Sequence, residues 1–264
     1  MKFKNVLLAS DFDGTLADSS GKIPDGVISA IKYFMSEGGL FTVCTGRIYQ
    51  GFHLYSEVYI NAPVLLGNGA MAYDYKNKNV IFNDAIGDEG IPAVEDILSD
   101  FPSVAVETYN FGTVCSINAC EDSIHHFTSQ GIDFTRVSDP NDASRPWTKV
   151  MIYAHGCSSD VQRLLDGHEE VNYLRTTGDY IEILKKGVDK GAGLLKLGGM
   201  IGCDVKDIYA AGDGYNDVDM LKAAAKGFVP ENGSPEALSV ADFVTRSNDM
   251  GCIAHAIEIL DSIY

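Results

Sequence analysis

The chain has 264 residues and a mass of 28.5 kDa, which allows one large or two modest domains with a full hydrophobic core. Its hydrophobic content of 45% and charged content of 22% are typical of a globular protein and exclude general disorder. The net charge of −17 argues against a nucleic-acid partner and an anionic membrane surface. It does not exclude a phosphate ester, because a metal ion and a few basic side chains reverse the potential locally.

The start of the chain and its cysteines indicate a cytoplasmic protein. Asp11 and Asp13 end the first apolar run before it reaches the length of a signal-peptide core, and no apolar stretch approaches membrane-spanning length. The six cysteines are scattered without a Cys-x-x-Cys pair. Reduced cytosolic thiols have this pattern, which favours neither a disulfide framework nor a zinc site.

The first predicted element is a short buried strand that ends at carboxylates. The apolar run Val6–Ala9 leads into Asp11 and Asp13, and ligands bind at the carboxyl ends of parallel strands. Being two apart on an extended segment, both carboxyls can point into one pocket, one as a nucleophile toward phosphorus and the other as a general acid/base. Gly14 allows a sharp turn, and we expect Thr15 to hydrogen-bond within it. The alternative is an Asp-Gly hairpin with a capping aspartate.

The next segments predict a parallel sheet. Apolar residues recur at helical spacing over 27–35, and buried strands are predicted at 40–44 and 64–66. A strand, a helix and a strand in this order indicate a right-handed βαβ unit.

Polar residues follow the strand at 40–44. Thr45, Gly46 and Arg47 offer a hydroxyl, a backbone amide and a guanidinium that can cradle a phosphoryl group. The alternative is that Thr45 is the N-cap of a following helix. Asn68 and Asn232 are further candidates for substrate contact.

From about residue 83 the pattern changes to helices that alternate with antiparallel strands. Helices are predicted at 91–98, 123–129 and 160–165, and strands at 104–111, 113–118, 149–153 and on both sides of Gly178 and Asp179. The βα pattern resumes at about residue 186. We therefore predict an α+β domain of residues 83–185 that is inserted into a first domain formed by residues 1–82 and 186–264.

Lys190 lies in the first turn of a helix predicted from the apolar residues over 192–197. The helix macrodipole disfavours a cation at this position, so an anion must favour it. A phosphate and the Asp11 carboxylate would serve. The alternative is an exposed lysine with slight strain.

A second acidic cluster follows a strand predicted at 208–211. Asp213 comes first after the strand and is the best candidate for a direct metal ligand, and Asn216 can contact a substrate phosphate. Asp217 can hold a metal-bound water or orient the lysine, whereas Asp219 is expected to face solvent. The alternative is an ordinary acidic helix start. Carboxylates brought together from both clusters repel one another, so a hard cation such as Mg²⁺ is the expected ligand.

Four motifs in this order resemble the haloacid dehalogenase (HAD) superfamily and, more narrowly, its Cof-type sugar-phosphatase branch. They are Asp-x-Asp-Gly-Thr at 11–15, Thr-Gly-Arg at 45–47, Lys-Gly at 190–191 and Gly-Asp-x-x-Asn-Asp at 212–217. The resemblance covers nearly the whole chain. It implies an α/β fold with a Rossmann-like parallel-sheet core and an inserted α+β cap that sets substrate specificity. One loop differs, because relatives tend to have Met-x-Asn-Ala where residues 229–233 read Val-Pro-Glu-Asn-Gly.

The resemblance also implies roles for individual residues. Asp11 would form an aspartyl-phosphate, and Asp13 would act as general acid/base and offer its backbone carbonyl to Mg²⁺. The remaining site residues would bind metal or phosphate: Asp213 completes the metal site, Thr45, Gly46 and Lys190 bind the phosphoryl group, Asn216 contacts substrate, and Asp217 lies behind the direct ligands.

The sequence therefore predicts a Mg²⁺-dependent phosphatase for small phosphorylated metabolites, with sugar phosphates first, acting as a monomer or homodimer. A phosphomutase of the same superfamily is the enzymatic alternative, because it hands the phosphoryl group to a second hydroxyl instead of water. A phosphate-sensing domain without turnover is the non-enzymatic alternative. Such a domain usually lacks one of the four motifs, and this chain has them all.

Overall fold

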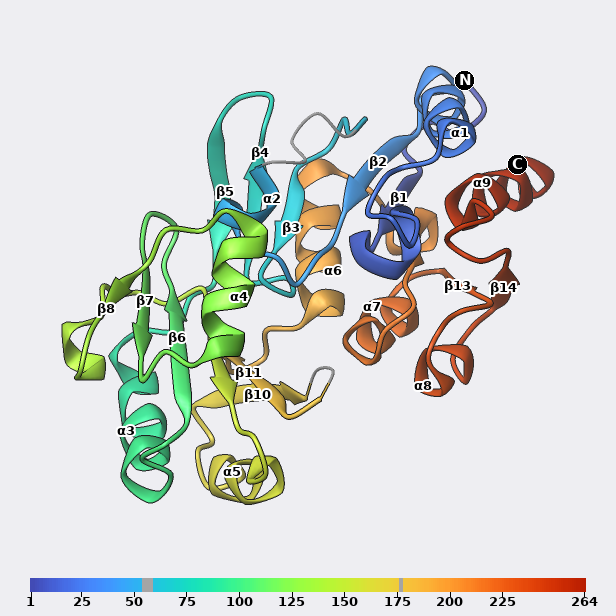
Figure 1. Ribbon diagram of the computed structural model, residues 1–264. Coiled ribbons are helices and arrows are strands. Elements are labelled where there is room, and N and C mark those ends of the chain that lie inside the picture. Colours follow the sequence, from blue (N-terminus) through green and yellow to red (C-terminus); the bar gives the residue numbers. More distant parts are fainter. Residues whose placement is uncertain (54–58, 176–177) are drawn as a thin grey trace. The chain divides into compact units, whose positions relative to one another are not determined.

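The computed structural model describes residues 1–53, 59–175 and 178–264. The chain divides into two compact units (Figure 1). The first unit comprises Met1–Gly46, Ser56–Phe82 and Asp189–Tyr264, and the second comprises Arg47–Tyr55 and Asn83–Val188. That the first unit is the catalytic core and the second unit is the cap stays a prediction.

The first unit contains a five-stranded parallel sheet. Its order is β14 (Phe243–Thr245), β13 (Lys226–Pro230), β12 (Ile208–Ala211), β1 (Leu7–Ser10) and β2 (Leu40–Val43). The strand β1 lies between β12 and β2, is parallel to both, and is buried along its whole length. The predicted α/β class with a parallel-sheet core is confirmed. The hairpin alternative for the first acidic cluster is wrong, because no strand returns antiparallel to β1 among the described residues.

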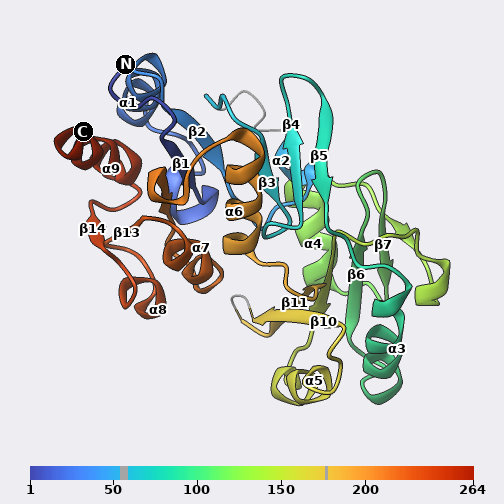
Figure 2. The ribbon, with the colours of Figure 1, turned by 180° about the vertical axis from the view of Figure 1, so that it is seen from behind.

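Helices cover both faces of this sheet. Leu7 and Ala9 of β1 share a buried cluster with residues of α6 (Lys190–Ile201) and α7 (Val218–Ala223). The helices α1 (Asp25–Ser36) and α9 (Cys252–Ile263) lie side by side on the opposite side of the strands (Figures 1 and 2). A short helix α8 (Pro235–Leu238) follows β13. Since successive side chains of a strand point to opposite faces, this arrangement buries both sides of β1.

A small antiparallel sheet extends the first unit. It consists of β3 (Val64–Leu66), β4 (Met71–Asp74) and β5 (Asn79–Asn83). A parallel bridge between Cys44 and Leu65 places β3 next to the end of β2. The sequence predicted β3 but not β4 and β5.

The second unit contains a six-stranded sheet that is antiparallel except for its pair β7–β8. Its order is β10 (Val171–Arg175), β11 (Tyr180–Lys185), β9 (Lys149–Tyr153), β6 (Ala105–Tyr109), β7 (Val114–Ile117) and β8 (Thr135–Arg136). Its helices are α2 (Tyr49–Phe52), α3 (Ile91–Asp100), α4 (Glu121–Gln130) and α5 (Ser158–Leu165). Trp147 is fully buried in the core between this sheet and residues of α3 and α5.

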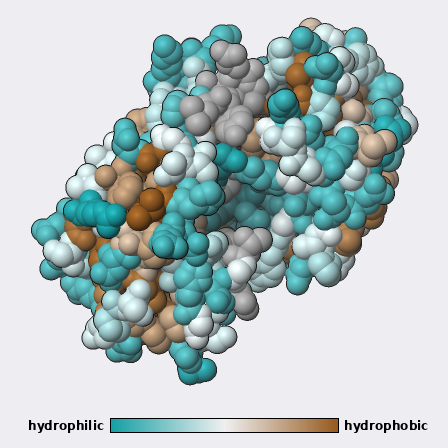
Figure 3. All heavy atoms as spheres, in the orientation of Figure 1, coloured by the Kyte–Doolittle hydropathy of each residue, from teal (hydrophilic) through white to brown (hydrophobic). Residues whose placement is uncertain are grey.

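Hydrophilic residues dominate the face drawn in Figure 3, and hydrophobic ones are scattered between them. Among the described residues, no helix is long and apolar enough to cross a membrane. All six cysteines are free thiols.

Candidate active site

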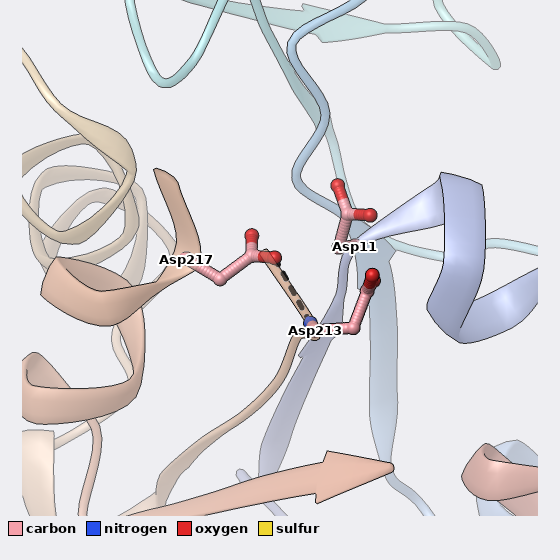
Figure 4. Close-up of side chains that lie close together, drawn as sticks. All are labelled: Asp11, Asp213 and Asp217. Carbon is pink, nitrogen blue, oxygen red and sulfur yellow. Dashed lines mark hydrogen bonds between the residues drawn. The ribbon is translucent and has the colours of Figure 1, made fainter. Parts of the chain in front are cut away.

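Adjacent strands bring the two acidic clusters together. Leu7 of β1 is paired with Ile208 of β12, and the parallel ladder continues until the Asp11 amide donates to the Ala211 carbonyl at 2.8 Å. Both strands therefore end at the same edge of the sheet. Carboxylate oxygens of Asp11, Asp213 and Asp217 all lie within 4.8 Å of one another (Figure 4).

Lys190 is buried among these carboxylates. Its Nζ lies 2.6 Å from Asp11 Oδ1 and 2.5 Å from Asp217 Oδ1, and the residue has no exposed surface. Although burial lowers the pKa of Lys190, the carboxylates of Asp11 and Asp217 raise it above its ordinary value overall. The alternative of an exposed lysine is therefore wrong. The two carboxylates offset the unfavourable interaction of the lysine charge with the helix macrodipole, as the sequence predicts.

Helix α6 begins at Lys190, and its preceding residue caps it. The Asp189 side chain accepts a hydrogen bond from the Ala192 amide at 2.8 Å. The close approach of α6 to the loop after β3 holds the lysine in place, because a Cβ on Gly193 would lie 2.7 Å from Gly69 backbone atoms. Glycine is required for this contact.

Thr15 has a different partner from the predicted one. Its Oγ1 donates to Asp213 Oδ1 at 2.6 Å, across 198 residues of sequence, instead of bonding within its own turn. The turn itself depends on Gly14, whose φ is +81°. A Cβ on Gly14 would also lie 2.5 Å from Asp213 Oδ2. The first acidic loop thus packs directly on the second.

Asp217 binds the lysine and the loop that carries Asp213. Its Oδ1 accepts from Lys190, and its Oδ2 accepts from the amide of Gly214 at 2.8 Å. Oδ2 also accepts from the amide of Asp213 at 3.0 Å (Figure 4). Both carboxylate oxygens are therefore engaged by protein donors. Asp219 in the first turn of α7 is exposed, as predicted.

Asp13 is separate from the close carboxylate group. It lies in the turn Phe12–Leu16 with extended backbone angles of φ −81° and ψ 121°, and its side chain is exposed. The close group consists of Asp11, Asp213 and Asp217 within the described ranges 1–53, 59–175 and 178–264. The predicted metal contact of Asp13 uses its backbone carbonyl and stays a prediction.

The site carries an excess of negative charge. Burial raises the pKa of Asp213 to about 6, although the hydrogen bond from Thr15 acts to lower this pKa. Burial also raises the pKa of Asp11 well above its ordinary value, although the Lys190 charge opposes this. Three carboxylates around one lysine leave two negative charges uncompensated when all are ionised. A divalent cation with a preference for oxygen ligands would balance these two negative charges.

The polar residues 45–47 follow β2, and the first of them lies beside the strand β3. The Thr45 amide donates to the Leu65 carbonyl at 2.9 Å, and the Asn68 amide donates to the Thr45 carbonyl at 3.0 Å. Thr45 is not a helix N-cap, because α2 begins after Ile48. Arg47 belongs to the second unit, and its part in phosphate binding stays a prediction.

Three asparagines hold the loops of the site together. Asn216 Nδ2 donates to Asn68 Oδ1 at 3.0 Å, and Asn232 Nδ2 donates to the Gly14 carbonyl at 2.9 Å. Asn232 Oδ1 accepts in turn from the Asn248 amide at 2.9 Å. The sequence offers Asn68 and Asn232 as candidates for substrate contact, and that role stays a prediction for both.

Comparison with known proteins identifies the family. The family model of haloacid dehalogenase-like hydrolases matches residues 8–257. The chain belongs to this family. The predicted HAD superfamily membership is thereby confirmed, and its Cof-type branch agrees with the relatives.

Two relatives from Bacillus subtilis (strain 168) are named 5-amino-6-(5-phospho-D-ribitylamino)uracil phosphatases. YwtE is 28% identical, with 96% of this chain and 97% of YwtE covered. YitU is 25% identical, with 98% of each chain covered. The family and these relatives confirm the prediction of a phosphatase-class hydrolase.

Solved structures share the fold. The HAD-superfamily phosphatase BT1666 from Bacteroides thetaiotaomicron has a TM-score of 0.86 at 24% identity, with 98% of this chain and 96% of that chain covered. The HAD subclass IIB sugar phosphatase BT4131 also has a TM-score of 0.86, at 20% identity, with 97% and 99% covered.

Proposed function

We propose that this HAD hydrolase is a Mg²⁺-dependent phosphatase that hydrolyses small phosphate esters, sugar phosphates first, through an aspartyl-phosphate on Asp11. The observation that carries the proposal is the buried Asp11 carboxylate held 2.6 Å from Lys190 Nζ beside Asp213 and Asp217. A carboxylate fixed by a cation at a strand end is suited to attack a phosphorus atom that the same cation also attracts.

The donor set suits a magnesium ion. Asp11 and Asp213 each use Oδ1 for a hydrogen bond, from Lys190 and Thr15 respectively, so that within the part of the chain described here Oδ2 remains for a cation. Asp11, Asp213 and the backbone carbonyl of Asp13 would hold the ion. When bound, Mg²⁺ neutralises the carboxylates and the charge of the phosphoryl group.

Residues of the protein carry out the chemical steps and hold the phosphoryl group. The Asp11 carboxylate attacks phosphorus, and Asp13 protonates the leaving oxygen and later takes a proton from the water that hydrolyses the aspartyl-phosphate. Lys190, Thr45, Gly46 and Asn216 hold the phosphoryl oxygens, with Arg47 as a further donor. Asp217 keeps Lys190 charged and in place, since it accepts from Lys190 Nζ at 2.5 Å.

The relatives support a phosphorylated polyol as substrate. YwtE and YitU are named for a phosphorylated ribitylamino-uracil, in which a sugar-alcohol chain carries the phosphate. We propose that residues 83–185 act as the cap that contacts the leaving group and excludes bulk water. The site chemistry requires only the phosphate end of such a substrate, so sugar phosphates and ribityl phosphates are tested together.

Phosphate release from p-nitrophenyl phosphate, with Mg²⁺ and with EDTA, tests the proposal. We expect release that requires Mg²⁺ and is abolished by Asp11→Asn. Release no faster than that of Asp11→Asn would instead support a phosphate-sensing domain. A panel of sugar phosphates, a ribityl phosphate, flavin mononucleotide and pyridoxal phosphate, compared by kcat/KM, then ranks the substrates. Phosphorus NMR of the products separates hydrolysis from a phosphomutase, which would yield an isomeric phosphate ester.

A further inference from the structure

A buried asparagine connects the two loops proposed to bind phosphate. Asn68 follows β3, has no exposed surface, and accepts through Oδ1 from Asn216 Nδ2 at 3.0 Å, across 148 residues of sequence. Its side-chain amide also packs on Gly46, where a Cβ would lie 3.1 Å from Asn68 Oδ1 and 3.3 Å from Nδ2. All three residues belong to the first unit.

The backbone conformation fixes the position of the Asn68 side chain. Its φ of +54° lies in the left-handed region, where asparagine is one of the few tolerated residues other than glycine. The neighbours Gly67 and Gly69 have φ values of 56° and 90°, and the Asn68 amide donates to the Thr45 carbonyl at 3.0 Å. The side chain is therefore anchored by a tight loop.

The contact decides which way the Asn216 amide faces. A primary amide has two N–H donors at one end and an acceptor oxygen at the other. Asn216 Oδ1 lies against Gly214, where a Cβ would be 2.6 Å away, and Nδ2 faces Asn68. One N–H is bound by Asn68, and among the described residues the second is left for a phosphoryl oxygen. In the reversed orientation Oδ1 would face Asn68 Oδ1 and the phosphoryl group, and both contacts would be repulsive.

We propose that Asn68 is a positioning residue that fixes the Asn216 amide with its N–H toward the phosphoryl group; this inference rests on the proposed function, in which Asn216 binds that group. Without Asn68, Asn216 loses the acceptor that selects the orientation. The loss of one hydrogen bond to a charged phosphoryl group lowers kcat/KM about 10- to 100-fold.

A double-mutant cycle tests the proposal. Asn68→Gly removes the amide and keeps the left-handed backbone, and kcat/KM for p-nitrophenyl phosphate and the Kd of orthophosphate are measured in wild type, both single variants and the double variant with Asn216→Ala. We expect Asn68→Gly to cost about 10- to 100-fold alone and less than about twofold in the Asn216→Ala background. Equal costs in both backgrounds would show a packing role and overturn the proposal. Asn5→Gly, an exposed left-handed asparagine in the same unit, is the matched control and should leave kcat/KM unchanged.

Asn68→Asp provides a second test if Asn68→Gly does not fold. The aspartate keeps an acceptor for Asn216, so Asn216→Ala should cost as much in this background as in the wild type, whatever the added charge does to overall activity. A loss of that cost would contradict the inference. A wild-type protein without Mg²⁺-dependent phosphate release would overturn the proposed function and this inference with it, whereas additivity in an active wild type overturns the inference alone.

Discussion

Replacing Lys190 with methionine leaves Asp11 and Asp217 buried without the cation that both contact at 2.6 and 2.5 Å. Removing one partner of a buried ion pair costs about 3–5 kcal/mol, because the remaining charge is not solvated. In a chain of this size each kcal/mol lowers the Tm by about 2–4 °C, so we expect a decrease of roughly 6–20 °C. The pKa of Lys190 is raised in the folded protein, so its stabilisation is complete at all pH values below the unfolded pKa of about 10.4.

Thermal unfolding at pH 7.5 in EDTA measures this effect. The matched control is Lys196→Met, an exposed lysine on the same helix α6, which should change stability by less than about 1 kcal/mol. Adding Asp217→Asn to Lys190→Met should recover part of the loss, since it removes one of the unpaired carboxylates. A Tm of Lys190→Met within about 2 °C of the control, taken with the scale of 2–4 °C per kcal/mol, would refute the proposed electrostatic role.

Three further predictions concern the metal and the acids. Asp13→Asn should lower kcat about 10²- to 10⁴-fold and leave the Kd of Mg²⁺ nearly unchanged in calorimetry, whereas Asp213→Ala should abolish Mg²⁺ binding; equal losses of affinity would show that the two roles are misassigned. Because burial raises the pKa of Asp213 to about 6, Mg²⁺ competes with a proton there, and its affinity should fall as the pH decreases through about 6; an affinity independent of pH between 5 and 8 would contradict this. Thr15→Val removes the 2.6 Å hydrogen bond to Asp213 and should weaken Mg²⁺ binding about 5- to 30-fold, with Thr15→Ser retaining most of the affinity; equal affinities of the valine and serine variants would argue against the contact.

The parts of the site that follow from local sequence could be predicted. Apolar runs ending at Asp11 and Asp213 indicate buried parallel strands, and such strands present their carboxyl ends at one edge of a sheet. The position of Lys190 in a first helical turn is unfavourable unless an anion is near, so its contact with Asp11 could be inferred. In each case a single residue conflicts with its local setting, and the conflict indicates a tertiary partner.

Other contacts left no such signal in the sequence. The hydroxyl of Thr15 satisfies a local turn as well as a distant carboxylate, so its bond to Asp213 depends on the packing of two loops. The partnership of Asn68 with Asn216 likewise depends on the register of strands far apart in sequence. The hairpin of β4 and β5 was missed because Asn79–Asn83 is a largely exposed edge with a weak hydrophobic pattern.

Trapping the phosphorylated residue tests the central claim most directly. With p-nitrophenyl phosphate the leaving group needs no proton, so Asp13→Asn should still form the aspartyl-phosphate but hydrolyse it slowly. Borohydride reduction followed by peptide mass spectrometry should then find the modified residue at position 11, in the presence of Mg²⁺ and not in EDTA. A label at another residue, or none while Asp13→Asn continues to release nitrophenol catalytically, would contradict Asp11 as the nucleophile.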